Sequence, residues 1–211
     1  ISDVHGNNAA LKAVLDYPFD HLAYTDIWCL GDVVGYGPVP YHVWLRLHRE
    51  NIPAGNWLGG NHDWGLLGKL PRFKLIKPDP NHPNGFRLGN FRDKAWNVLQ
   101  VHIDMLQYHD ELHEHIESLP VMSSPRAGVY LTHGAFDVDP QKSLAVNTTM
   151  PFFSPSKYVE KFEELHTREP TLAVRPHKHS DAPPRLFATG HSHTPGIWRW
   201  NSQSNTWEQQ P

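Results

Sequence analysis

The chain has 211 residues, of which 39% are hydrophobic and 19% charged, and its formal net charge is −3. This composition is typical of a folded chain with a substantial core, and the small charge provides no overall field that would attract nucleic acid or an anionic membrane. No apolar stretch reaches membrane-spanning length, and the one cysteine, Cys29, can form no disulfide within the chain, so we expect a cytoplasmic protein with a buried thiol.

The first third of the chain predicts strands that alternate with helices. Residues 1–7 are expected to end a strand and open into a loop, with Asn7 or Asn8 capping a helix that follows. Residues 26–30 form a short apolar run, typical of a strand covered on both faces. A helix over residues 40–50 and a strand over 54–58 come next. This alternation predicts an α/β sheet.

The middle of the chain has a different character. Residues 71–89 are rich in proline, asparagine and basic residues, which predicts an irregular loop, and residues 91–118 have helical periodicity with a break near Tyr108. We therefore expect a helical and loop insertion, a cap over about residues 71–119, within a single domain that spans residues 1–211. Histidines on these helices, among them His102, are expected to be exposed or half-buried.

Shorter elements are predicted to complete the chain. They are strands over residues 129–132 and 185–189, a helix over 156–166, and a closing hairpin over 197–208.

Five of the predicted strands end in polar residues that can bind metal, with glycine beside them. These residues are Asp3, His5, Asp32, Asn61, His62, His133, His191 and His193. Sites in open α/β sheets form beyond the carboxyl ends of the strands, so these side chains should converge, and glycine allows sharp turns and close backbone approach. Oxygen and imidazole donors without thiolate suit manganese, iron, zinc, nickel or cobalt. Each motif alone fits an ordinary turn or a surface histidine, and it is the ordered combination that favours a metal site.

Five ordered blocks resemble the calcineurin-like metallophosphoesterase superfamily. They begin at Asp3, Gly31, Gly60, Thr132 and Gly190, and the second, Gly-Asp-Val-Val-Gly-Tyr-Gly-Pro, is similar to a small prokaryotic branch of phosphodiesterases and phosphatases. The resemblance covers about residues 1–196. It implies an α/β (α+β) fold of four layers, αββα, in which two mixed sheets are flanked by helices and the metals lie at one edge.

The resemblance also implies a role for each residue. Asp3, His5, Asp32 and His193 would bind one metal ion, and Asp32 would bridge to a second ion bound by Asn61, His133 and His191. His62 would face the phosphate as the general acid, and Asp63 could support it. The implied cofactors are two divalent metal ions, with manganese favoured in vitro.

The implied reaction is hydrolysis of a phosphomonoester or phosphodiester by a hydroxide held between the two ions. The substrate would be a small molecule or a nucleotide, including a dinucleoside polyphosphate. Relatives with this pattern have residues before Ile1 and beyond the closing hairpin, so we expect the natural chain to continue past both ends.

The sequence departs from the protein serine/threonine phosphatase branch of this superfamily. Gly35 and Tyr36 stand where that branch has an aspartate and an arginine, and Gly59 stands where it has another arginine. The phosphate-clamping arginines are therefore missing, which argues against a phosphoprotein substrate. Two alternatives stay open: a nuclease acting on DNA or RNA ends, disfavoured by the small net charge, and a non-catalytic scaffold, disfavoured by the complete ligand set.

Overall fold

The structure is a computed structural model. It describes residues 1–17, 26–67, 76–78, 86–88, 93–126, 128–137, 154, 156–158, 160–161, 164, 186–191, 193, 196–201, 203–204 and 206–210.

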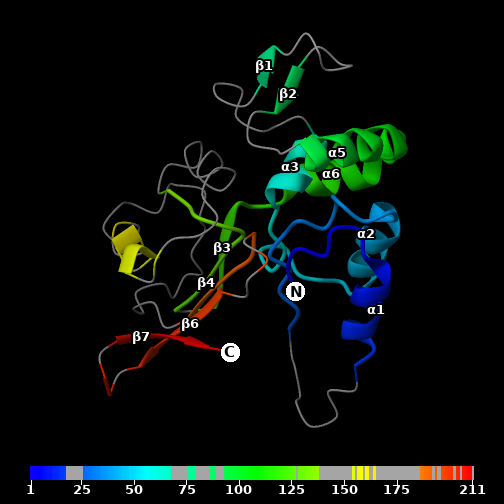
Figure 1. Ribbon diagram of the computed structural model, residues 1–211. Helices are drawn as coiled ribbons and strands as arrows, with labels where there is room; N and C mark the ends of the chain where they lie inside the picture. Colours follow the sequence, from blue (N-terminus) through cyan, green and yellow to red (C-terminus); the bar gives the residue numbers. More distant parts are fainter. Residues whose placement is uncertain are drawn as a thin grey trace.

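A five-stranded mixed sheet forms one side of the molecule (Figure 1). Its strands, in spatial order, are β3 (Met122–Arg126), β4 (Val129–Thr132), β5 (Leu186–Thr189), β6 (Gly196–Asn201) and β7 (Thr206–Gln210). Strands β4 and β5 pair in parallel, with Leu131 opposite Ala188, and the other pairs are antiparallel. The strands predicted over residues 129–132 and 185–189 and the closing hairpin are confirmed.

Three extended segments run beside this sheet: residues 1–3, residues 28–31 in the middle, and residues 56–58 as the third. They lead to the first proposed ligands. Ile1 O accepts a hydrogen bond from Leu30 N (2.8 Å), and Asp3 N donates to Gly31 O (3.0 Å). On its other side the middle segment bonds to the third, because Leu58 N donates to Cys29 O (2.8 Å). The strands predicted over residues 26–30 and 54–58 are thus extended and paired in parallel, although only the Cys29–Trp57 bridge is regular enough to count as sheet.

Helices pack on the opposite side of these segments (Figure 1). They are α1 (Asn8–Leu15), α2 (Pro40–Arg49), α3 (Asn61–Leu66), α5 (Asp93–Leu106) and α6 (Asp110–Ser118). The cap expected at the first helix is confirmed, because Asn7 Oδ1 accepts a hydrogen bond from Ala10 N at 3.0 Å. The helix boundaries near residues 40–50 and the break near Tyr108 also follow the prediction.

Four elements differ from the sequence-based prediction. Helix α3 begins at Asn61, where no helix was predicted, and a two-stranded hairpin of β1 (Ile76–Pro78) and β2 (Phe86–Leu88) lies within the predicted irregular loop. Strand β3 was not predicted at all. It contains Ser123, Ser124 and Pro125 and therefore lacks the apolar alternation that marks a strand. Its register with β4 also shifts between Ser123 and Arg126.

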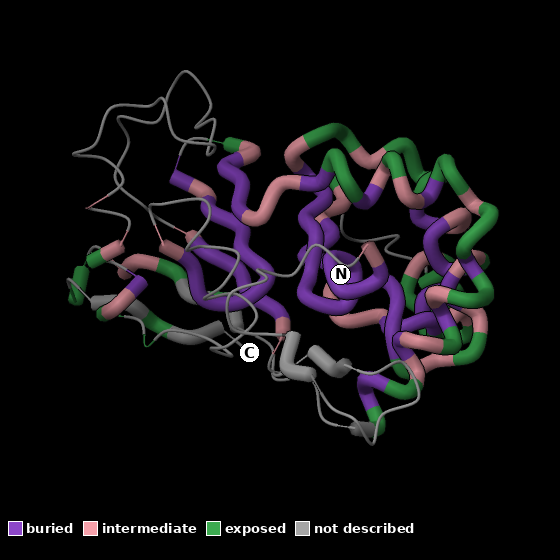
Figure 2. Tube along the Cα trace, turned by 90° about the horizontal axis from the view of Figure 1, so that it is seen from above, coloured by how far each residue is buried: buried purple, intermediate pink, exposed green. Residues whose placement is uncertain are grey.

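Two apolar clusters hold these layers together. Figure 2 shows buried residues along the interior of the trace and exposed residues mostly on its outer helices. The larger joins the helices, and Leu99 and Trp96 of α5 are buried in it together with Leu11, Val33 and Trp44. The helices of the proposed insertion therefore share the core of the N-terminal half. The division of the chain into one domain with a cap remains a prediction.

The smaller cluster joins the extended segments to the sheet. It contains Leu30 and Leu58 on one side and Leu131 and Ala188 on the other. The mixed α/β class of the prediction is confirmed. In the described part of the chain, no helix combines the length and apolar character that crossing a membrane would require.

Candidate metal centre

The proposed ligands come from the ends of the extended segments and of the parallel strands β4 and β5. Asp3 and Asp32 follow the first and second segments, Asn61 begins α3, His133 follows β4, and His191 and His193 follow β5. The two strand ends are joined directly, because Gly190 N donates to His133 O at 2.8 Å. All the predicted ligands therefore converge at one edge, as expected from strands that end together.

The first group of donors consists of Asp3, His5 and His193. The Nε2 atom of His5 lies 3.0 Å from His193 Nε2, 3.8 Å from Asp3 Oδ1 and 3.7 Å from Asp32 Oδ2. The other ring nitrogen of His5, Nδ1, lies 2.9 Å from Val34 O. Because a carbonyl oxygen can only accept, Nδ1 carries the proton, and Nε2 is left as a lone-pair donor directed at its neighbours.

The second group consists of Asp32, His133 and His191, with Asn61 between them. His133 Nδ1 donates to Leu30 O at 2.8 Å, so its Nε2 is again the free donor. That atom lies 3.3 Å from Asp32 Oδ2 and 3.0 Å from Asn61 Oδ1. His191 Nδ1 is 2.6 Å from the same Asn61 oxygen. Asp32 Oδ2 thus faces both groups of donors.

Backbone strain is concentrated at these residues. Seven described residues other than glycine have a positive φ, and five of them are proposed ligands: Asp3 (52°), His5 (48°), Asp32 (53°), His191 (66°) and His193 (57°). Left-handed conformations cost energy in residues with a Cβ and persist only where the surroundings impose them. The chain therefore stores strain where the donor atoms must converge.

Asp63 organises the loop that carries Asp32. Its Oδ2 atom accepts hydrogen bonds from Asp32 N (2.8 Å) and Gly60 N (3.0 Å), and its Oδ1 atom accepts from Val33 N (3.0 Å) and Val34 N (3.1 Å). Residue patterns had suggested only that Asp63 might support His62, because four such backbone contacts cannot be inferred from sequence. In the structure this carboxylate holds backbone in place around the proposed metal ligands.

The buried charges of the site influence one another strongly. Burial would raise the pKa of Asp32, but the imidazoles of His133 and His62 beside it lower that pKa well below its usual range. Burial would lower the pKa of His133, but the Asp32 carboxylate raises it to about 9. Burial lowers the pKa of His62 to about 4. Asp63 has a raised pKa, first because it is buried and second because Asp32 lies nearby.

The donor chemistry fits divalent cations. Two imidazole Nε2 atoms at 3.0 Å, both turned toward carboxylates, form an arrangement that a cation or a proton must stabilise. His62 also lies near enough to His5 and Asp32 to form a third possible donor group, so proximity alone leaves its role open.

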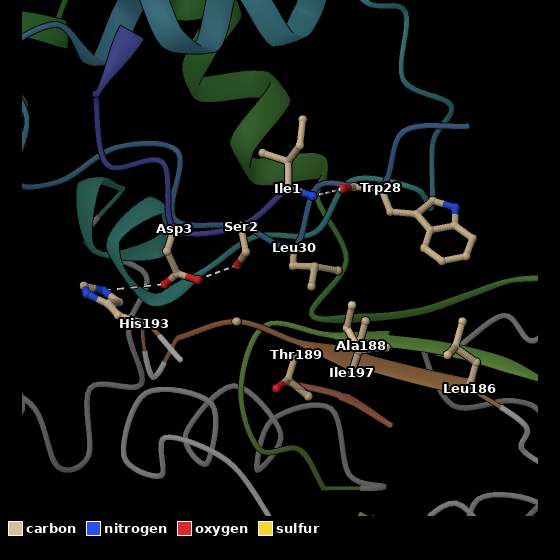
Figure 3. Close-up of a pocket in the computed structure, with 11 residues that line it drawn as sticks. Ile1, Ser2, Asp3, Trp28, Leu30, Leu186, Ala188, Thr189, His193 and Ile197 are labelled. Atoms are coloured by element: carbon tan, nitrogen blue, oxygen red, sulfur yellow. Dashed lines mark hydrogen bonds and ion pairs between the residues drawn. The ribbon is translucent and has the colours of Figure 1, made fainter. Parts of the chain in front are cut away.

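An apolar cavity of about 530 Å³ adjoins the first group (Figure 3). Asp3 and His193 line it at one end, and Trp28, Leu30, Ala188 and Ile197 line the rest. Trp64, which directly follows Asp63, belongs to the core and is 7% exposed.

Comparisons with known proteins show which chains this one is similar to. A family model described as calcineurin-like phosphoesterase matches residues 1–208. The crystal structure of a metallophosphoesterase from Sphaerobacter thermophilus has a TM-score of 0.55 and 26% identity, covering 100% of this chain and 67% of that one. An uncharacterized protein of Methanocaldococcus jannaschii is 42% identical over 69 residues, which are 33% of this chain and only 27% of that protein.

Proposed function

Because the chain belongs to the calcineurin-like phosphoesterase family, we propose that it hydrolyses a small phosphomonoester or phosphodiester at a centre of two divalent metal ions. Membership of this family supports metal-dependent hydrolysis of phosphoesters in general. The substrate, the metal and the roles of single residues are what we propose. A nucleotide is among the substrates we propose, manganese is the metal we favour in vitro, and the cytoplasm stays the expected location.

One observation carries the proposal: two groups of donors share a single carboxylate. Asp32 Oδ2 lies 3.7 Å from His5 Nε2 in the first group and 3.3 Å from His133 Nε2 in the second. The Asp32 side chain is 2% exposed, so its negative charge is poorly solvated and is stabilised by whatever cation lies beside it. A shared carboxylate is what a dinuclear site needs in order to hold two cations close together.

We propose that His62 supplies a proton in the reaction. When bound, two divalent ions would activate a water molecule and neutralise the charge that develops on the phosphate. His62 is 4% exposed, and its ring lies 4.7 Å from that of His5 between centroids. Burial lowers the pKa of its ring, and the negative charge of a phosphate beside it would raise that pKa. We propose that His62 then donates a proton to the departing oxygen.

The replacement His62→Ala tests this role. We expect turnover of phenyl phosphate, whose leaving oxygen needs a proton, to fall roughly 10²- to 10⁴-fold, as for other general acids, while the metal content stays close to that of the native protein. Turnover of p-nitrophenyl phosphate should fall much less, because p-nitrophenolate leaves without being protonated. Metal content is measured by mass spectrometry of the purified protein after loading with manganese. His42→Ala, at an exposed position on α2, is the control and should change neither quantity.

Each other result identifies an alternative. Loss of metal in His62→Ala would make His62 a ligand rather than an acid, as its place beside His5 and Asp32 permits. A native protein that binds metal but hydrolyses no generic ester would favour the scaffold. Faster cleavage of oligonucleotides than of small esters would favour the nuclease.

A further inference from the structure

His102 is buried inside the molecule and contacts the loop over residues 35–37. It lies on α5 and is 2% exposed, so the expectation that it would be exposed or half-buried is wrong. Its Nδ1 atom accepts a hydrogen bond from Gly35 N (3.2 Å), and its Nε2 atom donates to Gly37 O (2.9 Å). Both bonds require a neutral ring with the proton on Nε2, and burial lowers the pKa of His102, which favours that form.

The loop that His102 holds is fitted tightly against two histidines of the site. Gly35 has φ 104°, and a Cβ there would collide with the ring of His62 and would lie 2.8 Å from His5 Nδ1. At the other end of the loop, Gly37 N donates to His5 O at 2.7 Å. A Cβ at Gly37 would collide with His5 O, so the loop can occupy this place only with glycine on both sides of Tyr36.

Tyr36 projects from this loop beside the metal ligands. Its φ is 35°, another left-handed conformation, and its side chain is 50% exposed. The ring centroid lies 4.7 Å from that of His5, 4.9 Å from that of His62 and 6.2 Å from that of His193. An exposed aromatic ring thus stands next to the place where a phosphate ester would bind.

We propose that Tyr36 is a specificity-determining residue whose ring contacts the leaving group of the substrate and favours a flat aromatic one. His102 is the positioning residue that keeps the loop, and with it the ring, in place. This inference rests on the proposed function, because it assumes that a phosphate ester binds at the two donor groups. A nucleobase or another aryl group would pack on the ring, and an aliphatic group of equal size would pack less well.

Two inert ligands that differ only in their ring test Tyr36. Benzylphosphonate and cyclohexylmethylphosphonate carry the same anionic group on a flat and on a puckered ring, and inorganic phosphate serves as the reference. We expect the manganese-loaded native protein to bind benzylphosphonate about threefold to tenfold more tightly, measured by calorimetry. Tyr36→Phe should keep this ratio. Tyr36→Asn, chosen because asparagine tolerates a left-handed φ, should bring it close to one while leaving phosphate affinity unchanged.

The outcomes separate the two proposals. If the native protein binds both phosphonates equally, or if Tyr36→Asn keeps the preference, the inference about Tyr36 is wrong while the proposed function stands. If neither phosphonate nor inorganic phosphate binds to the metal-loaded protein, both are wrong.

The role of His102 is tested by the same ratio. His102→Leu removes both hydrogen bonds and should reduce the preference for benzylphosphonate to the level of Tyr36→Asn, with metal content unchanged. The double variant should show no further reduction, because both changes act through one ring. His102→Gln can still donate to Gly37 O and should restore part of the preference. A native ratio in His102→Leu would contradict the positioning role, whatever its melting temperature.

Discussion

At Asp63, four backbone N–H groups from two segments meet on one carboxylate. Asp63→Asn would place an amide NH₂ against N–H donors, leaving buried donors without an acceptor at about 1–3 kcal/mol each. We expect the free energy of unfolding of the metal-free protein to fall by about 2–4 kcal/mol in urea denaturation. Metal content should fall as well, because Asp32 lies on the loop that Asp63 holds.

The matched control is Asp104→Asn, at an exposed position on α5, which should change the free energy of unfolding by less than about 0.5 kcal/mol. If Asp63→Asn were as stable as this control, the carboxylate would not be needed to hold the loop.

The buried thiol of Cys29 should make the free energy of unfolding depend on pH. Burial raises the pKa of its thiol from 9.0 to about 12 in the folded chain. Above pH 9 the unfolded chain therefore loses a proton that the folded chain keeps, so stability is intact below pH 9 and declines by about 1.4 kcal/mol per pH unit from there towards pH 12. Cys29→Ala should lack this decline.

The measurement compares urea denaturation of the native chain and Cys29→Ala between pH 8 and pH 10, with chelator present. Other groups also titrate in this range, but they contribute equally to both proteins. Parallel pH profiles for the two would contradict the prediction.

At the scale of elements, the sequence predicted best those segments whose apolar residues have a clear period. The strand ends that carry Asp32 and His133 were found because an apolar run precedes glycine and polar residues in each case. Helix α3 was missed because asparagine, histidine and aspartate are also typical of turns. The burial of His102 was missed because periodicity identifies a helix but not the loop, 65 residues away, that the helix contacts.

Because helix α5 shares the larger apolar cluster, we expect the proposed insertion to unfold together with the rest of the chain. Leu99 is 0% exposed in the larger apolar cluster, whereas Met105 on the same helix is 49% exposed. We expect Leu99→Ala to lower the free energy of unfolding by about 2–5 kcal/mol and Met105→Ala to lower it by less than about 1 kcal/mol. Both variants should unfold in a single transition in urea.

A separate early transition in Leu99→Ala, seen as two steps in the circular dichroism curve, would contradict this expectation. It would show that the helices over residues 93–118 form a unit that unfolds independently.

At the scale of the whole molecule, the donor groups join segments from opposite ends of the sequence. His5 and His193 are 188 positions apart, yet their Nε2 atoms lie 3.0 Å from each other. In the unfolded chain these donors are scattered, so a metal ion that needs all of them binds only the folded state and stabilises it by mass action. If these residues bind metal as proposed, the metal bonds would help to offset the strain at the five proposed ligands.

Metal binding should accordingly raise the melting temperature. At a manganese concentration one hundred times the dissociation constant the gain is about 2.7 kcal/mol, which for a chain of this size corresponds to roughly 5–10 °C in calorimetry. His62→Ala and His42→Ala should show the same rise as the native protein, since neither removes a proposed ligand. Asp32→Asn should show little or none, because it removes the charge that both donor groups face. If manganese raised the melting temperature of Asp32→Asn as far as that of the native protein, the ion would be binding elsewhere. The shared carboxylate could then not be the centre of the site.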